Sequence, residues 1–478
     1  MKRKLTILIS LFSAVVLLCQ ASYAEIISVE KAQLVAKNLY FERVNLKKET
    51  VSYQNIKFNA AVTVTNNSTP IYYVFNCTSE IGFVIVSAES NAYPILAYSF
   101  ESYYDKENLN ESVKEIMDRY EKEILVIRAK NLTADDETNR AWEKYSATTI
   151  QKSGDEITSV GPLIQTTWNQ SCYYNTLCPV GNGSYGYCNH VPVGCVATAM
   201  AQIMRYWSYP STGLGSHSYS SMGFHDVDFS AQTYNWSAMP NSITEENAEV
   251  AKISYHAGVS VDMSYAAGGS SASTQAATNA LKFNFNYSST TQYVDKSSYT
   301  NVQWDILIRS NLIDSKPLIY RGSGGSGGHA FIVDGFDYPD HYHINWGWGG
   351  SHNGLFYLSS LNSGNGDFTQ NQGAIINCYP SNISGSSNNI NENNISENIN
   401  IVPNPNNGNF SIILNNSEKG NFTIKIMDIS SRVIFEKNIN KESDIIKENF
   451  NLTDINYGFY FVSIEGNNFK SVKKFIVK

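Results

Sequence analysis

Residues 192–207 read PVGCVATAMAQIMRYW, and this stretch decides how the central part of the chain is built. Its apolar residues recur at the i, i+3, i+4 and i+7 spacing of a helix that buries one face. They are Val196, Ala199, Met200, Ile203, Met204 and Trp207. The pattern predicts a buried helix with Cys195 in its first turn. Gly194 allows the backbone to bend sharply just before that helix, because it has no Cβ.

The first turn of a helix is a special place for a cysteine. The unpaired N–H groups and the positive end of the helix dipole stabilise a thiolate there. Cys195 is therefore a candidate nucleophile. The alternative is a buried structural thiol or one half of a disulfide, and this segment alone does not separate the two interpretations.

A second segment places a histidine at the start of an apolar run. Residues 322–328 are only Gly and Ser, and residues 329–335 read HAFIVDG. The apolar residues predict a central strand that begins at His329, beside a loop on the substrate side. A plain linker is the alternative, but a linker rarely runs straight into a buried strand.

Residues 343–350 read HINWGWGG and predict a second strand, paired with the first across a turn at 338–341. In that arrangement Asn345 could hydrogen-bond the imidazole of His329, and Trp346 could shield that contact from water. A tryptophan-rich core strand with no catalytic part is the alternative for this segment in isolation.

The order and spacing of these residues favour chemistry over structure. His329 lies 134 residues after Cys195 (329 minus 195), and Asn345 lies 150 after it (345 minus 195). Papain-like peptidases place a His and an Asn about 130–150 residues beyond the catalytic Cys. In such a set the imidazole takes the thiol proton, and the third group fixes the orientation of the ring.

The three motifs, GCVATAMAQIM from Gly194, GGHAF from Gly327 and NWGWGG from Asn345, together resemble the streptopain family of papain-like cysteine peptidases. The similarity covers residues 25–380. It implies an α+β chain in which a helical half carries the nucleophile and an antiparallel sheet half carries the histidine. The roles implied are nucleophile for Cys195, base for His329, and orienting and covering groups for Asn345 and Trp346.

The same resemblance implies further site residues. Gln170 occupies the place of a glutamine that donates to the oxyanion, and an amide there would stabilise a tetrahedral intermediate. Gly328 would lie beside the substrate. Met263 belongs to a segment, 260–265, that resembles a part of the family near the substrate cleft.

Three cysteines crowd the stretch before the nucleophile: Cys172, Cys178 and Cys188. With His190 they could suggest zinc, but they lack the short Cys-x-x-Cys pairs of zinc modules. Disulfides that close the loop are the favoured interpretation, because an exported chain permits them. Residues 172–378 hold an odd number of cysteines, so one thiol is expected to stay free. No metal or other cofactor is expected.

Residues 1–24 have the pattern of a secretory signal peptide, with basic residues at 2–4, an apolar run at 5–18 and small residues before Glu25. The run is too short for a membrane-spanning helix. A lipoprotein signal at Cys19 is disfavoured by the bulky Leu18 before it. The sequence therefore predicts an exported protein.

Residues 25–150 read as an α+β unit that resembles the inhibitory propeptide of the same family. A helix is predicted from Ser28, strands at 71–75, 82–86 and 93–98, and a helix over 113–127. The implied role is to assist folding and block the cleft until cleavage. Residues 131–160 are polar without a period, which predicts a linker open to proteolysis.

The C-terminal part divides into a linker at 383–400 and a small β-sandwich at 401–478. The latter is similar to the sorting domains of type IX secretion, which implies secretion or an outer-membrane surface location in a Gram-negative bacterium. A carbohydrate-binding or adhesive sandwich is the alternative. The peptidase domain is expected over 151–382.

Charge and motifs together limit the possible functions. The net charge of −8 offers no basic stripe for nucleic acid. The prediction is a secreted cysteine endopeptidase made as a zymogen, with a thioester acyl-enzyme. The expected partners are polypeptide substrates, the chain's own propeptide and the secretion machinery. An acyl transferase or amidase, and a non-enzymatic adhesin or inhibitor, are the alternatives.

Overall fold

The structure is a computed structural model that describes residues 25–477 except 48–50, 149–158, 182–187, 325–326, 338–340, 359–371, 383–398, 405, 429–432, 453–454, 456–457 and 467–469. The predicted signal peptide, residues 149–158 of the predicted linker at 131–160, and residues 383–398 of the predicted linker at 383–400 lie outside the described residues.

The N-terminal region packs helices against an antiparallel sheet, as predicted. The helices are α1 (Val29–Lys47), α2 (Glu111–Lys130) and α3 (Asp136–Tyr145). The strands are β1 (Val62–Asn66), β2 (Thr69–Asn76), β3 (Phe83–Ser87) and β4 (Ile95–Ser99). The predicted helices and strands are confirmed, including the start of α1 next to Ser28, whose Oγ accepts from the Lys31 N–H.

Helix α3 corrects the prediction that residues 131–160 form a linker. Thr138, Ala141, Trp142 and Tyr145 are buried, at spacings of three and four residues, so the helix has one apolar face. The Trp142 indole N–H donates to the Ala92 carbonyl, and the Tyr145 carbonyl accepts from Asn38. The face is short and interrupted by charges, which is why the sequence pattern did not reveal it.

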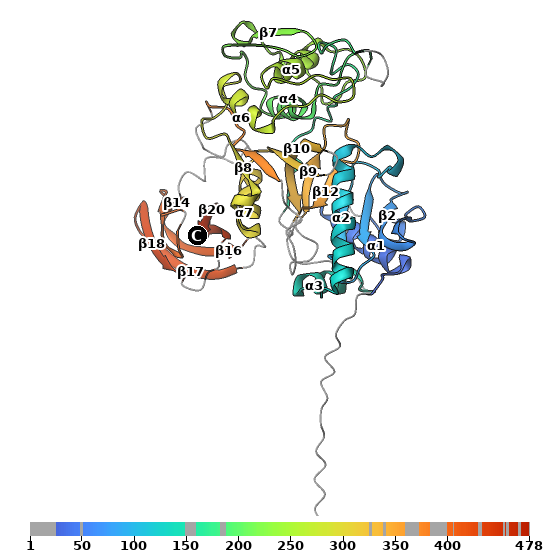
Figure 1. The fold of residues 1–478 in the computed structure, drawn as a ribbon. Coiled ribbons are helices and arrows are strands. Elements are labelled where there is room, and N and C mark those ends of the chain that lie inside the picture. Colours follow the sequence, from blue (N-terminus) through green and yellow to red (C-terminus); the bar gives the residue numbers. More distant parts are fainter. Residues whose placement is uncertain are drawn as a thin grey trace, which may run out of the picture.

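The central region has a helical half and a sheet half, which confirms the predicted α+β class (Figure 1). The helical half contains α4 (Cys195–Trp207), α5 (Ala248–Val259), α6 (Thr274–Phe283) and the hairpin β6 (Ser216–Ser220) and β7 (Phe224–Asp228). The sheet half contains β5 (Ser159–Val160), β8 (Gln292–Asp295), β9 (Leu318–Gly324), β10 (Gly327–Asp337), β11 (His341–Asn345), β12 (Gly354–Tyr357), β13 (Gly373–Ile376) and α7 (Asn301–Ile313).

One antiparallel sheet runs through both regions. Among the described residues its order is β1-β2-β3-β4-β12-β11-β10-β9-β13-β8, with β5 paired to β10. The two regions meet where β4 pairs with β12, Leu355 opposite Tyr98 and Phe356 opposite Ala97. The N-terminal region therefore continues the central sheet through backbone hydrogen bonds.

Strand β10 separates two hydrophobic cores because its side chains alternate between the sheet faces. Ala330 and Ile332 face a core built with α4, α5 and α6. Phe331 and Val333 face a second core that also contains side chains of α1, α2 and β2–β4. The N-terminal region thus completes one of the two cores of the central sheet.

The C-terminal region is a small β-sandwich, as predicted. One sheet has the order β14 (Ile399–Val402), β15 (Asn409–Asn415), β18 (Ile445–Asn451), and the other has the order β17 (Val433–Lys441), β16 (Gly420–Asp428), β19 (Gly458–Glu465), β20 (Lys470–Val477). Alternate residues of β15 and β16 are buried in a shared core.

Over the described residues, no helix has both the length and the apolar composition needed to cross a membrane.

Candidate active site

A cavity of about 460 Å³ lies where the helical half meets the sheet half. Cys195 and Gln170 line it from the helical side, and Gly328, His329 and Trp348 line it from the sheet side. The structure therefore brings together residues that are far apart in the sequence, including four of the predicted site residues.

Cys195 is the first residue of α4, as predicted. The preceding Gly194 has φ of 93°, in the left-handed region that favours glycine. A Cβ at this position would lie 2.5 Å from the Met263 sulfur. Only glycine fits there, so the tight turn fixes where the thiol enters the cavity.

Cys195 and His329 form a polarised pair. Burial alone would raise the pKa of the Cys195 thiol, but the charge and hydrogen bond of His329, together with backbone N–H groups of Ala330 and Val196, lower it below its ordinary value. Burial would likewise lower the pKa of His329, but the Cys195 charge and hydrogen bond raise it. Both shifts favour a thiolate beside an imidazolium.

The second neighbour of His329 is not the predicted one. The main-chain carbonyl of Trp346 also favours the charged imidazole and contributes to its raised pKa. The His329 Nε2 atom is buried and makes no hydrogen bond of good geometry with any described residue. The ring is therefore held by Cys195, by the Trp346 carbonyl and by packing.

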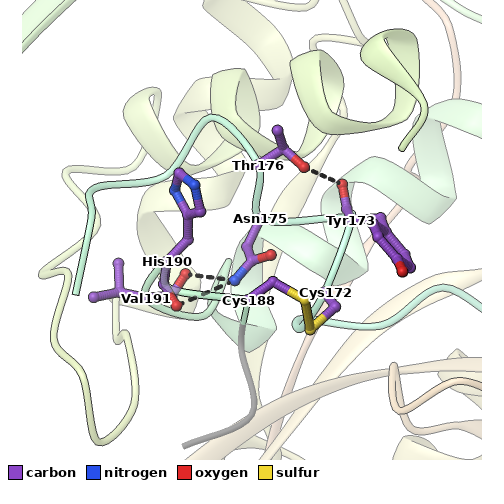
Figure 2. Close-up of a disulfide and its surroundings, with 7 residues drawn as sticks. All are labelled: Cys172, Tyr173, Asn175, Thr176, Cys188, His190 and Val191. Carbon is purple, nitrogen blue, oxygen red and sulfur yellow. Dashed lines mark hydrogen bonds between the residues drawn. A yellow bond between two sulfur atoms is a disulfide. The ribbon is translucent and has the colours of Figure 1, made fainter. Parts of the chain in front are cut away.

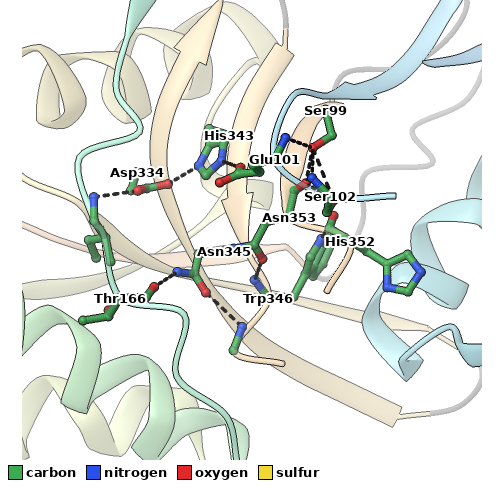
Figure 3. Close-up of polar contacts among 12 residues, drawn as sticks. Ser99, Glu101, Ser102, Thr166, Asp334, His343, Asn345, Trp346, His352 and Asn353 are labelled. Carbon is green, nitrogen blue, oxygen red and sulfur yellow. Dashed lines mark hydrogen bonds and ion pairs between the residues drawn. The ribbon is translucent and has the colours of Figure 1, made fainter. Parts of the chain in front are cut away.

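Asn345 hydrogen-bonds the Thr166 segment (Figure 3) and not His329 as expected. Its Nδ2 donates to the Thr166 carbonyl at 2.7 Å, and its Oδ1 accepts from the Gly347 N–H at 3.1 Å. The strand register explains the difference, because Asn345 lies opposite Ile332 in β10, three residues beyond His329.

Trp348, rather than the predicted Trp346, covers His329. Its ring stacks on the imidazole with centroids 6.3 Å apart and an interplanar angle of 27°. Trp346 is only 1% exposed, packs on Phe331 and Phe356, and donates its indole N–H to the His352 carbonyl. The sequence offers both tryptophans, and only the backbone turn between them decides which one reaches the cavity.

Gln170 and Gly328 lie where the sequence predicted, at the cavity. The Gln170 carbonyl accepts from the Val193 N–H at 2.9 Å, which ties this residue to the segment that leads into Cys195. Gly328 is exposed on the opposite wall, next to His329.

Met263 does not line the cavity, which corrects its predicted contact with substrate. Its side chain is fully buried behind Gly194 and supports the turn before Cys195. The cavity wall is instead formed by residues 268–274, which begin with GGSS. This run of small residues is the sequence signal for a loop beside the cleft.

A disulfide joins Cys172 and Cys188, the loop predicted to be closed by cysteines (Figure 2). Next to it, Asn175 Nδ2 donates to the carbonyls of His190 and Val191, each at 3.2 Å. These contacts hold the Gln170 segment against the segment that precedes α4.

The other cysteines of this region are free. Cys178 and Cys378 are buried thiols, and Cys195 is partly exposed. The region therefore has three free thiols rather than the single one expected. Burial in apolar surroundings raises the pKa of Cys178 and of Cys378 to about 12 each, so neither is a thiolate at neutral pH.

His190, the histidine considered for a zinc site, has its Nδ1 atom 2.7 Å from the Cys178 carbonyl, so this nitrogen is occupied by a hydrogen bond. In the described part of the chain, no group of three His, Cys, Asp or Glu side chains could hold a metal ion.

The N-terminal region reaches into the same cavity through Glu115 of α2. Burial raises the pKa of Glu115, against the opposing effect of His329, Arg119, Lys122 and Arg321. Nothing in the sequence pattern of α2 distinguishes Glu115 from other surface carboxylates, so its place at the cavity follows only from the tertiary structure.

A second contact between the regions lies beside β11 (Figure 3). His343 hydrogen-bonds Asp334 of β10 through Nδ1 and Glu101 of the N-terminal region through Nε2. Burial alone would lower the pKa of His343, but the charges and hydrogen bonds of Asp334 and Glu101 raise it to about 10. A charged histidine thus bridges the two regions.

Three family descriptions match consecutive parts of the chain. Residues 24–124 match the Spi protease inhibitor, residues 168–356 match the peptidase C10 family, and residues 400–478 match the secretion system C-terminal sorting domain. Cys195 and His329 lie within the second match, and Glu101 and Glu115 lie within the first.

Individual proteins agree with these matches. The thiol protease/hemagglutinin PrtT of Porphyromonas gingivalis is 29% identical over 376 residues, which cover 73% of this chain and 41% of that protein. A fragment of Prevotella intermedia prointerpain A is similar in structure, with a TM-score of 0.55, 28% identity, and coverage of 67% of this chain and 99% of the fragment. Streptopain of Streptococcus pyogenes is 31% identical over 335 residues, which cover 64% of this chain and 80% of streptopain. The match to the family description, the similarity to 80% of streptopain, and the α4 cysteine and β10 histidine in one cavity show that the chain belongs to the peptidase C10 family.

Proposed function

We propose that the chain is a secreted cysteine endopeptidase, made as a zymogen, in which Cys195 is the nucleophile and His329 the general acid and base. The observation that carries this proposal is the Cys195–His329 pair in the cavity, with a lowered thiol pKa and a raised imidazole pKa. Both shifts favour the thiolate form of the pair, which is the nucleophilic form of a cysteine.

The proposed reaction has two stages. The Cys195 thiolate attacks the carbonyl carbon of a peptide bond, and the amide of Gln170 with the Cys195 backbone N–H stabilises the oxyanion. His329 then gives its proton to the leaving amine, and a thioester remains. Water, deprotonated by His329, attacks the thioester and releases the second product with the thiolate restored.

Asn345 and Trp348 are proposed as positioning groups in this reaction. Trp348 stacks on His329 and limits the access of water to the pair. Asn345 holds the end of β11 against the Thr166 segment of the helical half. Gly328 leaves room for the substrate backbone beside His329, because it has no side chain.

The other two regions set when and where the enzyme acts. Glu115 enters the cavity and β4 extends the central sheet, so residues 25–150 are proposed as an intramolecular inhibitor removed on maturation. The matched sorting domain indicates delivery outside the cell or to the outer-membrane surface, by the secretion machinery. The peptidase domain is proposed over 151–382, with a linker at 383–400 and the sorting domain at 401–478.

The test compares the full chain with its Cys195→Ala variant. We expect the parent to convert itself to a shorter form and to digest casein, and the variant to do neither. Cys178→Ala is the matched control, because this thiol is buried away from the cavity. An alanine variant at 195 that digests casein as fast as the parent would show that the nucleophile is another residue. A parent that transfers acyl groups but cleaves no polypeptide would favour a transferase.

A further inference from the structure

Arg321 of β9 brings a permanent positive charge to the lining of the cavity. Residues 161–380 hold few basic side chains, namely Arg205, Lys252, Lys282, Lys296, Arg309, Lys316 and Arg321. Among the described residues that line the cavity, only Arg321, His329 and Glu115 carry ionisable side chains of the acid or base type apart from Cys195. The position of Arg321 in an acidic, cation-poor chain therefore requires an explanation.

Arg321 is held in place from the side away from the cavity. Its backbone pairs with Ala330 in β10 and with Gly373 in β13. Ala330 directly follows His329, so Arg321 lies on the strand next to the one that carries His329. Its side chain hydrogen-bonds Tyr293 and feels the charge of Asp295, both in β8. Asp295 is also engaged by Ser297, whose hydroxyl and N–H donate to the same oxygen at 2.6 and 3.0 Å.

In the precursor the N-terminal region places a carboxylate, Glu115, in the lining of the same cavity as Arg321. The cations that act on Glu115 are, in decreasing order of effect, His329, Arg119, Lys122 and Arg321, and its Oε1 is 3.6 Å from where a Cβ at Gly322 would be. Burial disfavours the charge of this carboxylate, so the cationic surroundings offset a real cost. Once the N-terminal region is removed, the described cavity lining keeps its cation and has no carboxylate.

We propose that Arg321 forms a subsite for an acidic side chain of the substrate polypeptide, and that Glu115 occupies this subsite in the precursor. The inference rests on the proposed function and adds a substrate preference to it. A guanidinium fixed by neighbours on one side and open to a cavity on the other favours a carboxylate, which it can bind through two N–H groups.

The first experiment measures the preference directly on the processed enzyme. Pairs of fluorogenic peptides differ only by Glu or Gln, placed in turn at each of the positions flanking the cleaved bond. At one position we expect kcat/KM for the Glu peptide to exceed that for the Gln peptide by about tenfold, equivalent to about 1.4 kcal/mol. In Arg321→Gln we expect this ratio to fall to about one, and in Arg321→Lys to fall only in part.

Lys282→Gln is the matched control, because it removes one positive charge from α6, where the ammonium lies over Phe283 outside the cavity lining. It should keep the Glu:Gln ratio of the parent. A parent with no preference for Glu at any position, or a ratio that Arg321→Gln leaves unchanged, would overturn the inference while the proposed endopeptidase stands. A parent that cleaves no peptide at all contradicts the proposed function and the inference with it.

A second measurement needs no variant and so does not depend on folding. Raising the NaCl concentration of the assay screens an ionic contact at a cleft open to solvent. We expect the Glu:Gln ratio of the parent to decrease as salt increases. A preference for Glu that is independent of salt would show that shape, rather than the charge of Arg321, selects it.

The occupancy by Glu115 is tested on the full-length precursor. Glu115→Gln keeps the shape of the side chain and removes its charge, so we expect the precursor to mature several-fold faster. Glu143→Gln, at an exposed position of α3, is the matched control. Equal maturation rates for Glu115→Gln and the parent would show that Glu115 does not hold the subsite.

Discussion

At the scale of single residues, Gln202 connects the segments around the cavity. It lies seven residues after Cys195, about two turns along α4, and is fully buried. Its Oε1 accepts from the Thr166 hydroxyl at 2.9 Å, the Trp168 N–H at 3.1 Å and Asn345 Nδ2 at 3.3 Å. One side chain thus links the nucleophile helix, the Gln170 segment and the end of β11.

We predict that Gln202→Leu destabilises the protein, because three buried donors lose their acceptor at a cost of about 1–3 kcal/mol. Urea unfolding of the Cys195→Ala precursor, which does not digest itself, provides the measurement. Gln275→Leu is the control, because Gln275 is exposed on α6. A loss of stability no larger than that of the control would show that the three donors find other partners.

The Cys195–His329 pair gives a second prediction at this scale. His329 is the main group that lowers the thiol pKa against the effect of burial. In His329→Gln the Cys195 pKa should therefore rise, and alkylation by iodoacetamide should slow by up to about tenfold for each unit by which this pKa rises above the assay pH. The measurement is the alkylation rate against pH; an unchanged profile would mean that the helix terminus alone ionises Cys195.

At the scale of elements, the junction of β4 with β12 joins inhibitor and peptidase. Backbone pairing is reinforced by side chains on either side of it. Tyr93 stacks on Tyr357 with centroids 4.6 Å apart, and the Tyr120 hydroxyl donates to the Tyr357 carbonyl at 2.8 Å. The junction buries apolar surface of both partners, so removal of the N-terminal region exposes part of a core.

Tyr93→Ala should weaken this junction by about 3 kcal/mol, by analogy with other buried aromatic side chains replaced by alanine. We expect the precursor to mature faster, which a time course on denaturing gels measures. Tyr103→Ala is the control in the same region, because Tyr103 is 50% exposed. If both variants mature at the rate of the parent, dissociation at this junction does not limit maturation.

At the scale of the whole molecule, two histidines between the regions give the precursor opposite responses to pH. Burial is the main reason that the pKa of His341 is lowered to about 3, and its Nε2 donates to the Ile95 carbonyl. Its contribution to stability is lost as the pH falls from about 6.5, the ordinary value, toward 3. The pKa of His343 is raised to about 10, so its contribution is complete below about 6.5 and is lost as the pH rises toward 10.

These two effects predict that the precursor is most stable near pH 6–7. Thermal unfolding of the Cys195→Ala precursor between pH 4 and 10 measures the dependence. In His343→Gln the decrease on the alkaline side should become shallower, while the decrease on the acid side should persist. A variant with the same alkaline slope as the parent would show that other groups cause it.

The sequence by itself determined the local elements and the chemistry they carry. The spacing of apolar residues in α4 and the apolar run after His329 place a cysteine at a helix start and a histidine on a strand, because helix and strand periodicity are local properties. The tertiary structure alone decided which residues surround that pair. Asn345 hydrogen-bonds the Thr166 carbonyl, and Trp348 rather than Trp346 stacks on the imidazole. Met263 packs behind the turn that precedes Cys195, and Glu115 reaches the cavity from the N-terminal region. These outcomes depend on strand register and on packing between distant segments, which no local pattern encodes.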